Sequence, residues 1–308
     1  MGEPAAVNDP DAVINALGLT KRYGRRRAIE DVTFSVQEGE IFGFLGPNGA
    51  GKTTTIRALL GLVRLQHGRA TMFGEPAGRA DRSRLGFVPG ELSLFESMTG
   101  GQVLDYLGAL TRRPALRRTQ LLERFALSRQ DLGRPIRHYS RGMKQKLGIV
   151  QALQHDPVLL VMDEPAEGLD PLMQQAFYQL LDELRARGRT VFISSHLLWE
   201  VERICDRVAI IREGRLVATE RIDSLRQRSP RRVEVQFSRA ADAAAFRPPA
   251  GVAVDRVDGA RLTMRVPVER TASMLDALAP WDVADLVWER PSLEDIFLGY
   301  YRGHPDAS

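Results

Sequence analysis

The chain has 308 residues, with 43 Lys and Arg against 39 Asp and Glu and a single cysteine, Cys205. A net charge of only +4, spread along the chain, does not indicate a nucleic-acid binder, and one cysteine excludes a disulfide scaffold. With 44% hydrophobic and 27% charged residues, the composition is that of a globular protein of about two domains. No apolar run approaches the roughly 18 residues of a membrane span, so we expect the chain not to cross a bilayer.

The predicted elements alternate between strands and helices over most of the chain. Residues 1–12 hold two prolines and three acids and are expected to lack order. Alternating apolar positions and short apolar runs predict strands, which fall at residues 12–19, 32–36, 41–45, 85–88, 158–162, 190–193 and 207–211. The run 158–162 is apolar throughout, as in a buried parallel strand. We therefore predict an α/β core with a parallel sheet.

Two regions depart from this alternation. Residues from about 98 to 153 have helical patterns and predict a helical insert, with helices at 101–111, 114–126 and 141–154. The polar stretch 227–232 predicts a linker, and residues 231–308 predict a small α+β domain. Its signals are a hairpin at Asp258-Gly259, a helix at 271–278 and a capping box from Ser292 to Asp295 that begins a last helix.

A glycine-rich loop follows the strand predicted at 41–45. Residues 46–53 read Gly-Pro-Asn-Gly-Ala-Gly-Lys-Thr and match the pattern G-x-x-x-x-G-K-[ST] between a strand and a helix. Glycines let backbone N–H groups converge on one anion, and the helix N-terminus adds partial positive charge. Lys52 would supply charge to the β- and γ-phosphates, and the Thr53 hydroxyl would bind Mg²⁺. The alternative, a tight turn without a ligand, is disfavoured by the complete pattern.

Polar side chains also follow two other predicted strands. Because the ends of parallel strands border the ligand crevice, we expect Asp163 to hold Mg²⁺ through a water molecule and Glu164 to polarise the water that attacks the γ-phosphate. His196 follows the strand at 190–193, where contact with the γ-phosphate is expected. Taken alone, the two carboxylates would fit an acidic turn and the histidine a structural role.

The segment Tyr139-Ser140-Arg141-Gly142-Met143-Lys144-Gln145 resembles the L-S-G-G-Q signature of ATP-binding cassette (ABC) proteins, with Ser140 and Gly142 retained. Taken alone, it would fit a capped helix without a ligand. With the phosphate loop and the carboxylates, residues 13–226 resemble the nucleotide-binding subunit of bacterial drug exporters. The resemblance implies a P-loop NTPase core of the ABC type with a helical subdomain at about 98–153, an accessory domain at 231–308, and ATP and Mg²⁺ as ligands.

The resemblance also implies that two copies of the chain bind two ATP molecules head to tail. Glu164 and His196 would be catalytic, Thr53 and Asp163 would bind the metal, and Tyr23 would stack on adenine, with a buried structural role as its alternative. Ser140 and Gly142 would act in trans, and Gly168-Leu169-Asp170 would join the two sites. The nucleotide-binding residues implied are Tyr23, Gly46, Pro47, Asn48, Gly49, Ala50, Gly51, Lys52, Thr53, Thr54, Ser140, Gly142 and Asp170.

The chain departs from the family pattern in the signature, where Tyr139, Arg141 and Met143 replace its Leu, first Gly and Gln, and at one further position. The family commonly has a glutamine, after a proline such as Pro89, that touches Mg²⁺ and senses the membrane partner. This chain has Gly90 there, followed by Glu91, a carboxylate that could take its place. The stretch 90–99 is where the resemblance places the docking of the partner's cytoplasmic helix.

The resemblance implies an ATPase that energises a separate transmembrane permease at the cytoplasmic face of the cell membrane, exports drugs or other hydrophobic compounds, and binds no nucleic acid. The alternatives are a soluble regulatory cassette in translation or DNA repair, an importer subunit, and a degenerate cassette that only binds ATP. A single cassette with a short insert disfavours the regulator, and Glu164 with His196 disfavours the degenerate form.

Overall fold

The computed structural model describes residues 9, 11–92, 95–228 and 230–289. The contacts divide the chain into two compact units, Met1–Glu220 and Arg221–Ser308. Two predictions lie outside the described residues. They are the disorder expected for most of residues 1–12 and the last helix, which was expected to begin at the capping box Ser292–Asp295. No helix within the described residues is long and apolar enough to cross a membrane.

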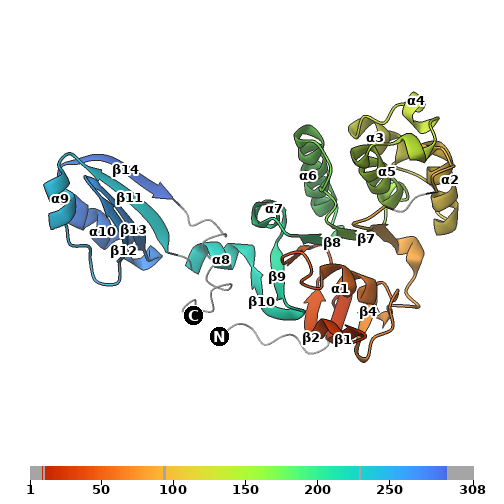
Figure 1. Cartoon of the computed structure of the whole chain (residues 1–308), viewed down its shortest axis with the longest axis horizontal. Coiled ribbons are helices and arrows are strands. Elements are labelled where there is room, and N and C mark those ends of the chain that lie inside the picture. Colours follow the sequence, from red (N-terminus) through yellow and green to blue (C-terminus); the bar gives the residue numbers. More distant parts are fainter. Residues whose placement is uncertain (1–8, 10, 93–94, 229, 290–308) are drawn as a thin grey trace. The chain divides into compact units, whose positions relative to one another are not determined.

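A six-stranded sheet forms the centre of the first unit (Figure 1). Its strands β3, β6, β7, β8 and β9 are parallel, as predicted, and the edge strand β10 adds to β9. The strands in sheet order are β10 (Arg215–Arg221), β9 (Arg207–Arg212), β3 (Ile41–Leu45), β8 (Thr190–Ser195), β7 (Leu159–Asp163) and β6 (Leu85–Val88). The carboxyl ends of β3, β7 and β8 therefore lie side by side, at one edge of the sheet.

A second, antiparallel sheet was not predicted. It contains β2 (Arg26–Val36), β1 (Ile14–Tyr23), β4 (His67–Met72) and β5 (Glu75–Pro76), in that order. The first half of β4 is exposed and lacks the apolar alternation that would have revealed a strand. Gly24 and Arg25 form the turn of a hairpin between β1 and β2, and β2 begins at Arg26.

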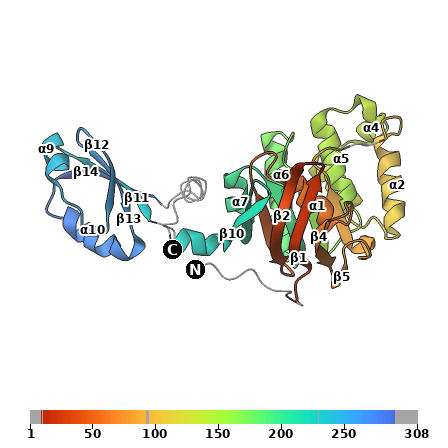
Figure 2. The same ribbon diagram turned by 60° about the horizontal axis from the view of Figure 1, so that its bottom comes forward.

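Four phenylalanines join the two sheets. Phe34 of β2 packs on Phe42 and Phe44 of β3 and on Phe192 of β8, with ring centroids 5.4–5.9 Å apart. Helix α1 (Lys52–Leu59) buries Ile56 and Leu59 in the same core. On the other side of the six-stranded sheet lie α5 (Arg141–Leu153) and α6 (Pro171–Ala186) (Figures 1 and 2).

The remaining elements of the first unit are mostly helical. The described residues between 100 and 153 form helices and no strand, as expected for the helical insert. Side-chain caps fix several starts: Thr99 and Gln102 form a capping box, and Ser140 and Asp170 cap α5 and α6. The bounds are η1 (Arg82–Arg84), α2 (Gly100–Thr111), α3 (Arg118–Arg124), α4 (Arg129–Leu132), η2 (Ile136–His138), α5 (Arg141–Leu153), α6 (Pro171–Ala186) and α7 (Leu198–Ile204).

The second unit is the small α+β fold predicted for the C-terminal residues. Its antiparallel sheet has the order β12-β13-β11-β14. Asp258 pairs directly with Arg261, so the hairpin loop is Gly259-Ala260, one residue beyond the predicted position. The bounds are α8 (Ile222–Arg228), β11 (Arg231–Phe237), α9 (Ala240–Ala245), β12 (Ala253–Asp258), β13 (Arg261–Val266), η3 (Val268–Arg270), α10 (Thr271–Leu278) and β14 (Val283–Glu289).

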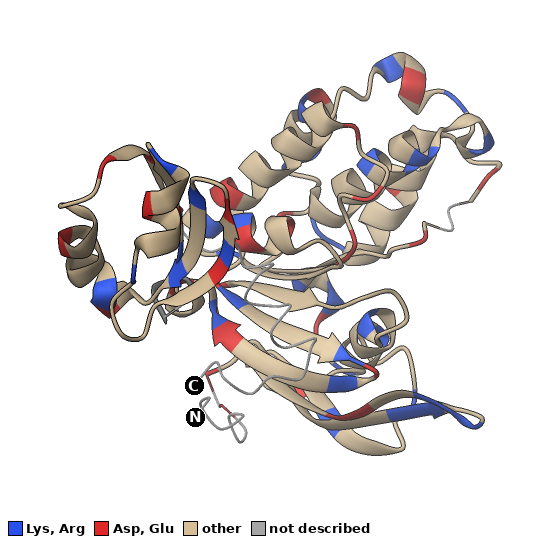
Figure 3. Ribbon diagram, turned by 60° about the vertical axis from the view of Figure 1, so that its left-hand side comes forward, with Lys and Arg blue, Asp and Glu red and all other residues tan. Residues whose placement is uncertain are grey.

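Buried apolar residues alternate with charged residues along the strands of this small sheet. Inward-facing Val233, Val235 and Met264 form the core with the two helices. Between them, Arg261 pairs with Glu234 at 3.1 Å and Arg265 with Asp255 at 2.8 Å. Figure 3 shows basic and acidic residues interspersed along the ribbon. The charges on these strands are thus largely paired with one another.

We expect Phe192→Ala to lower the free energy of unfolding by about 3–5 kcal/mol, because it leaves a cavity between the two sheets. Urea denaturation measures this change. Phe95→Ala, the same substitution at an exposed ring, should cost less than about 1 kcal/mol. Equal losses in the two variants would contradict the role of the phenylalanine cluster.

Candidate active site

The phosphate loop connects the end of β3 to the start of α1. Gly51 is the N-cap of α1, with φ +111° and no side-chain cap on the first backbone N–H groups. A Cβ at Gly51 would lie 2.7 Å from the carbonyl oxygen of Ala28, so a side chain does not fit. The first N–H groups of α1 are therefore left to an anion in the loop.

Lys52 is buried and folds back over this loop. Its Nζ donates to the carbonyl oxygens of Gly46, at 2.6 Å, and Pro47, at 3.3 Å. The same atom lies 3.0 Å from Oε1 of Glu164. The side chain therefore brings a positive charge to the point where the loop meets the end of β7.

Asp163, the last residue of β7, is held by two hydroxyl groups. Thr53 Oγ1 donates to its Oδ2 at 2.7 Å, and Ser194 Oγ donates to its Oδ1 at 2.5 Å. Adjacent ligands of an octahedral Mg²⁺ lie about 2.9 Å apart, so the Thr53 and Asp163 oxygens are close to the spacing of two neighbouring ligands. Both predicted metal ligands thus come together from different elements.

Glu164 turns out of the strand in a left-handed conformation, φ +48°, that is uncommon for residues other than glycine. Its backbone N–H is directed at the carbonyl oxygen and Oγ of Ser194, at 3.2 and 3.1 Å. Its Oε2 lies 2.8 Å from Nδ1 of His196. Burial alone would raise the pKa of Glu164, but Lys52 and then His196 outweigh it and lower the pKa, so the carboxylate is ionised at neutral pH.

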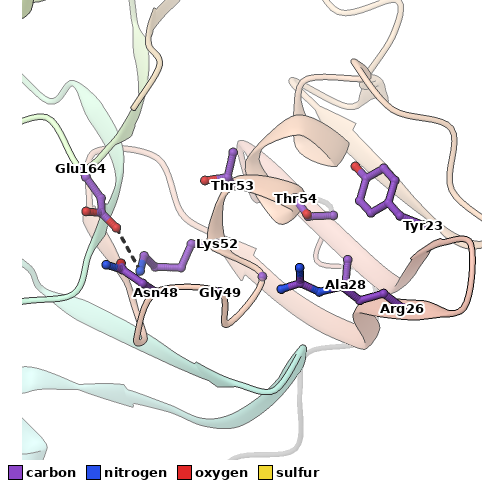
Figure 4. Close-up of a pocket in the computed structure, with 10 residues that line it drawn as sticks. Tyr23, Arg26, Ala28, Asn48, Gly49, Lys52, Thr53, Thr54 and Glu164 are labelled. Carbon is purple, nitrogen blue, oxygen red and sulfur yellow. Dashed lines mark ion pairs between the residues drawn. The ribbon is translucent and has the colours of Figure 1, made fainter. Parts of the chain in front are cut away.

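Lys52, Thr53 and Glu164 border a cavity of about 400 Å³, whereas Asp163 and His196 do not line it. Figure 4 shows Glu164 and Lys52 at one end, joined by their ion pair, and the ring of Tyr23 at the other. Tyr23 is 46% exposed, which differs from the buried alternative. The cavity is lined by Tyr23, Arg26, Ala28, Asn48, Gly49, Gly51, Lys52, Thr53, Thr54 and Glu164. Gly46, Pro47 and Ala50 are part of the loop without lining the cavity.

Sequence reasoning missed two residues here. Arg26, an exposed residue of β2, lines the cavity, and its Nη2 lies 3.8 Å from where a Cβ of Gly49 would be. Arg26 and Ala28 share one face of β2, so the period of two would have found them had the strand been recognised. Ser194, which binds both Asp163 and Glu164, has no signal in the sequence apart from its place two residues before His196.

The residues expected to act in trans lie elsewhere on the first unit. Ser140 and Asp170 are exposed N-caps of α5 and α6, and none of Ser140, Gly142 and Asp170 lines the cavity. The start of α5 lies against the turn that precedes α6: a Cβ at Gly142 would lie 2.8 Å from the carbonyl oxygen of Gly168. The structure therefore brings the signature segment and residues 168–170 to one surface.

The structure shows the surroundings of two residues that depart from the family pattern, Tyr139 and Gly90. Tyr139, in the place of the signature leucine, is buried, donates to the carbonyl oxygen of Asp131 at 2.6 Å, and packs where a Cβ on Gly100 would clash. Gly90 lies beside Asp163, where a Cβ would be 3.4 Å from Oδ2. Glu91 has an exposed side chain, and its replacement of the family glutamine stays a prediction.

A model of the ABC transporter family matches residues 29–167. A daunorubicin resistance ATP-binding protein of Streptomyces coeruleorubidus is 35% identical over 311 residues, which cover 92% of this chain and 94% of that protein. The chain belongs to the ABC transporter ATP-binding proteins. The family predicted from the phosphate loop and the signature segment is thereby confirmed.

Other members of the family match over shorter spans. An ABC transporter ATP-binding protein of Nostoc is 41% identical over 204 residues, 64% of this chain and 61% of that protein. The bacitracin transport ATP-binding protein of Bacillus licheniformis is 36% identical over 233 residues, 73% of this chain and 75% of that protein. The chain spans less than two thirds of the Nostoc protein, and 56% of a Synechocystis relative.

Solved structures confirm the fold class. The ATP-binding subunit of an ABC transporter superposes with a TM-score of 0.64 at 32% identity, over 70% of this chain and 92% of that one. A cassette solved as a dimer with bound ADP and phosphate has a TM-score of 0.62 at 22% identity, over 68% of this chain and 98% of that one. The predicted P-loop ATPase core of the ABC type is therefore correct.

We expect Arg26→Ala to weaken ATP binding about 10- to 100-fold, because a charged hydrogen bond to the nucleotide would contribute about 1.5–3 kcal/mol. Titration with a fluorescent ATP analogue measures the affinity. Arg27→Ala is the matched control, since Arg27 pairs with Glu30 and does not line the cavity. An unchanged affinity in Arg26→Ala, or equal losses in both variants, would contradict a role for Arg26 in binding.

Proposed function

We propose that this chain is an ATP-hydrolysing subunit that energises a separate transmembrane permease. The observation that carries the proposal is that Glu164 contacts both Lys52 and His196. Its Oε1 lies 3.0 Å from Lys52 Nζ at one end of the cavity, and its Oε2 lies 2.8 Å from His196 Nδ1. Tyr23 at the far end offers an open aromatic face for the adenine. The cavity thus offers a cation and a proton acceptor near the γ-phosphate, and a flat aromatic surface for the adenine ring.

The groups around Glu164 suit the hydrolysis step. A water oxygen bonds to the γ-phosphorus, the bond from that phosphorus to the bridging oxygen breaks, and ADP and phosphate leave. Glu164 takes the proton of the water, and its lowered pKa keeps it ionised for that purpose. His196 holds the other carboxylate oxygen, and Lys52 with the N-terminus of α1 stabilises the charge on the phosphates.

Thr53 and Asp163 would hold Mg²⁺ at this site. Two oxygen donors 2.7 Å apart suit a hard cation that takes its other ligands from phosphates and water. Among the residues that the structure describes, no cluster of three or more His, Cys, Asp or Glu could hold a metal without such ligands. When bound, Mg²⁺ would neutralise charge on the β- and γ-phosphates.

A homodimer would complete the site. Ser140, Gly142 and Asp170 lie on one surface away from the cavity, which suits contact with the nucleotide of a second copy. ATP would then supply an anion between two helix N-termini, α1 of one copy and α5 of the other. Hydrolysis removes the γ-phosphate and its contacts, so the dimer would reopen.

The permease partner is proposed to dock on the helical insert. Phe95 is 52% exposed, packs edge-on against exposed Tyr106 with centroids 5.4 Å apart, and lies in the stretch 90–99. Leu110 is exposed on the same face of α2, one turn beyond Tyr106. Docking there would place the chain at the cytoplasmic face of the membrane.

Export of drugs or other hydrophobic compounds is the proposed direction of transport. The names of the Streptomyces and Bacillus relatives refer to daunorubicin resistance and bacitracin transport. These names favour a transporter subunit over a regulatory cassette. Because they differ in cargo, we assign the choice of cargo to the permease.

We expect Glu164→Gln to lower the rate of ATP hydrolysis about 100-fold or more, because the proton acceptor is lost. ATP affinity should stay close to that of the wild type, because the bound phosphates compensate the charge of Lys52 in place of Glu164. Phosphate release and nucleotide titration measure the two quantities. Lys52→Ala, which removes the cation, should instead weaken binding as well as turnover. Rapid turnover by Glu164→Gln would show that Glu164 is not the base.

A further inference from the structure

Two consecutive serines at the end of β8 bind carboxylates on opposite sides of the strand. Ser194 Oγ donates to Asp163 and lies 3.1 Å from the N–H of Glu164, within the site described above. Ser195 Oγ donates instead to Oε2 of Glu200 and lies 2.9 Å from the N–H of Leu197. Neighbouring strand residues point to opposite faces, so the end of β8 is held from both sides just before His196.

Glu200 is a buried carboxylate outside the cavity. It is 6% exposed, in the first turn of α7, and it has no part in the hydrolysis step proposed above. Tyr178 of α6 donates to its Oε1 at 2.7 Å, and Ser195 donates to its Oε2. Each carboxylate oxygen thus binds a hydroxyl group from a different element, which ties α6, α7 and β8 together around one buried charge.

His196 lies in the short turn that Glu200 closes. Its side chain is 36% exposed, and its Nδ1 lies 2.8 Å from Oε2 of Glu164. Helix α7 starts at Leu198 with Leu197 as its N-cap, and no side-chain hydrogen bond caps it. The backbone of residues 196–197 is therefore fixed by Ser195 and Glu200, and the orientation of the imidazole follows from that backbone.

We propose that Glu200 is a positioning residue for ATP hydrolysis. By binding Ser195 and Tyr178 it fixes the turn that holds His196 Nδ1 2.8 Å from Glu164 Oε2. His196 in turn orients the carboxylate that takes the proton of the attacking water. The inference rests on the proposed ATPase function, but Glu200 touches neither the nucleotide cavity nor the base itself.

The first test is a comparison of kcat and KM. Glu200→Ala should lower kcat about 10- to 100-fold, the effect of a misplaced catalytic group, while the KM for ATP changes less than about twofold. Glu200→Gln keeps an acceptor oxygen and should recover most of the rate. Glu75→Ala, at an exposed glutamate of β5, is the matched control and should leave both constants unchanged. An equal rise in KM for Glu200→Ala would overturn the proposal.

The second test separates positioning from general structural support. If Glu200 acts through His196, the double variant His196→Ala/Glu200→Ala should have the same kcat as His196→Ala alone. A role in stability only would lower kcat further in the double variant. Additive losses would therefore overturn the proposal.

A third readout does not depend on turnover. The chain has five histidines, and His196→Ala identifies the ring signals of His196 in a histidine-labelled NMR spectrum. In Glu200→Ala those signals should shift or broaden while the signals of exposed His67 stay in place. Unchanged His196 signals would overturn the positioning role. Absence of hydrolysis by the wild type would overturn the proposed ATPase function instead, and the NMR comparison would still decide whether Glu200 positions His196.

Discussion

The ion pair between Lys52 and Glu164 is the interaction on which the site depends. It joins the phosphate loop to the end of β7, two segments more than 100 residues apart in sequence. Both side chains are largely buried, so each charge needs the other, and loss of one would leave an uncompensated charge. The same pair lowers the pKa of Glu164 against the effect of burial. One contact thus anchors the loop and keeps the base ionised.

The fold explains why this contact forms. In the parallel sheet, β3, β7 and β8 end side by side, so the loop after β3, the carboxylates after β7 and His196 after β8 share one edge. The phenylalanine cluster fixes the antiparallel sheet on this core, and that sheet brings Tyr23 and Arg26 to the far end of the cavity. The cavity proposed to bind the nucleotide is therefore lined from both sheets, although the groups proposed for the chemistry follow the strands of one of them.

Local patterns in the sequence predicted the phosphate loop, the carboxylates and most strands of the parallel sheet, because each depends on a few adjacent residues. The comparisons then confirmed the family. The antiparallel sheet was missed, since β4 lacks apolar alternation, and with it the place of Arg26 in the cavity. The contacts of Ser194 and of Glu200 with Tyr178 were also beyond prediction, because they join residues that only the folded sheet and helices bring together.

Sedimentation of the Glu164→Gln variant with and without saturating Mg·ATP tests most directly whether ATP bound at this cluster joins two copies of the chain. Without hydrolysis, the contacts of the γ-phosphate with both copies persist, so we expect a monomer without nucleotide and a stable dimer with ATP. ADP should leave the monomer unchanged. A chain that remains monomeric with ATP bound at saturation would contradict a site completed by Ser140 and Gly142 of a second copy.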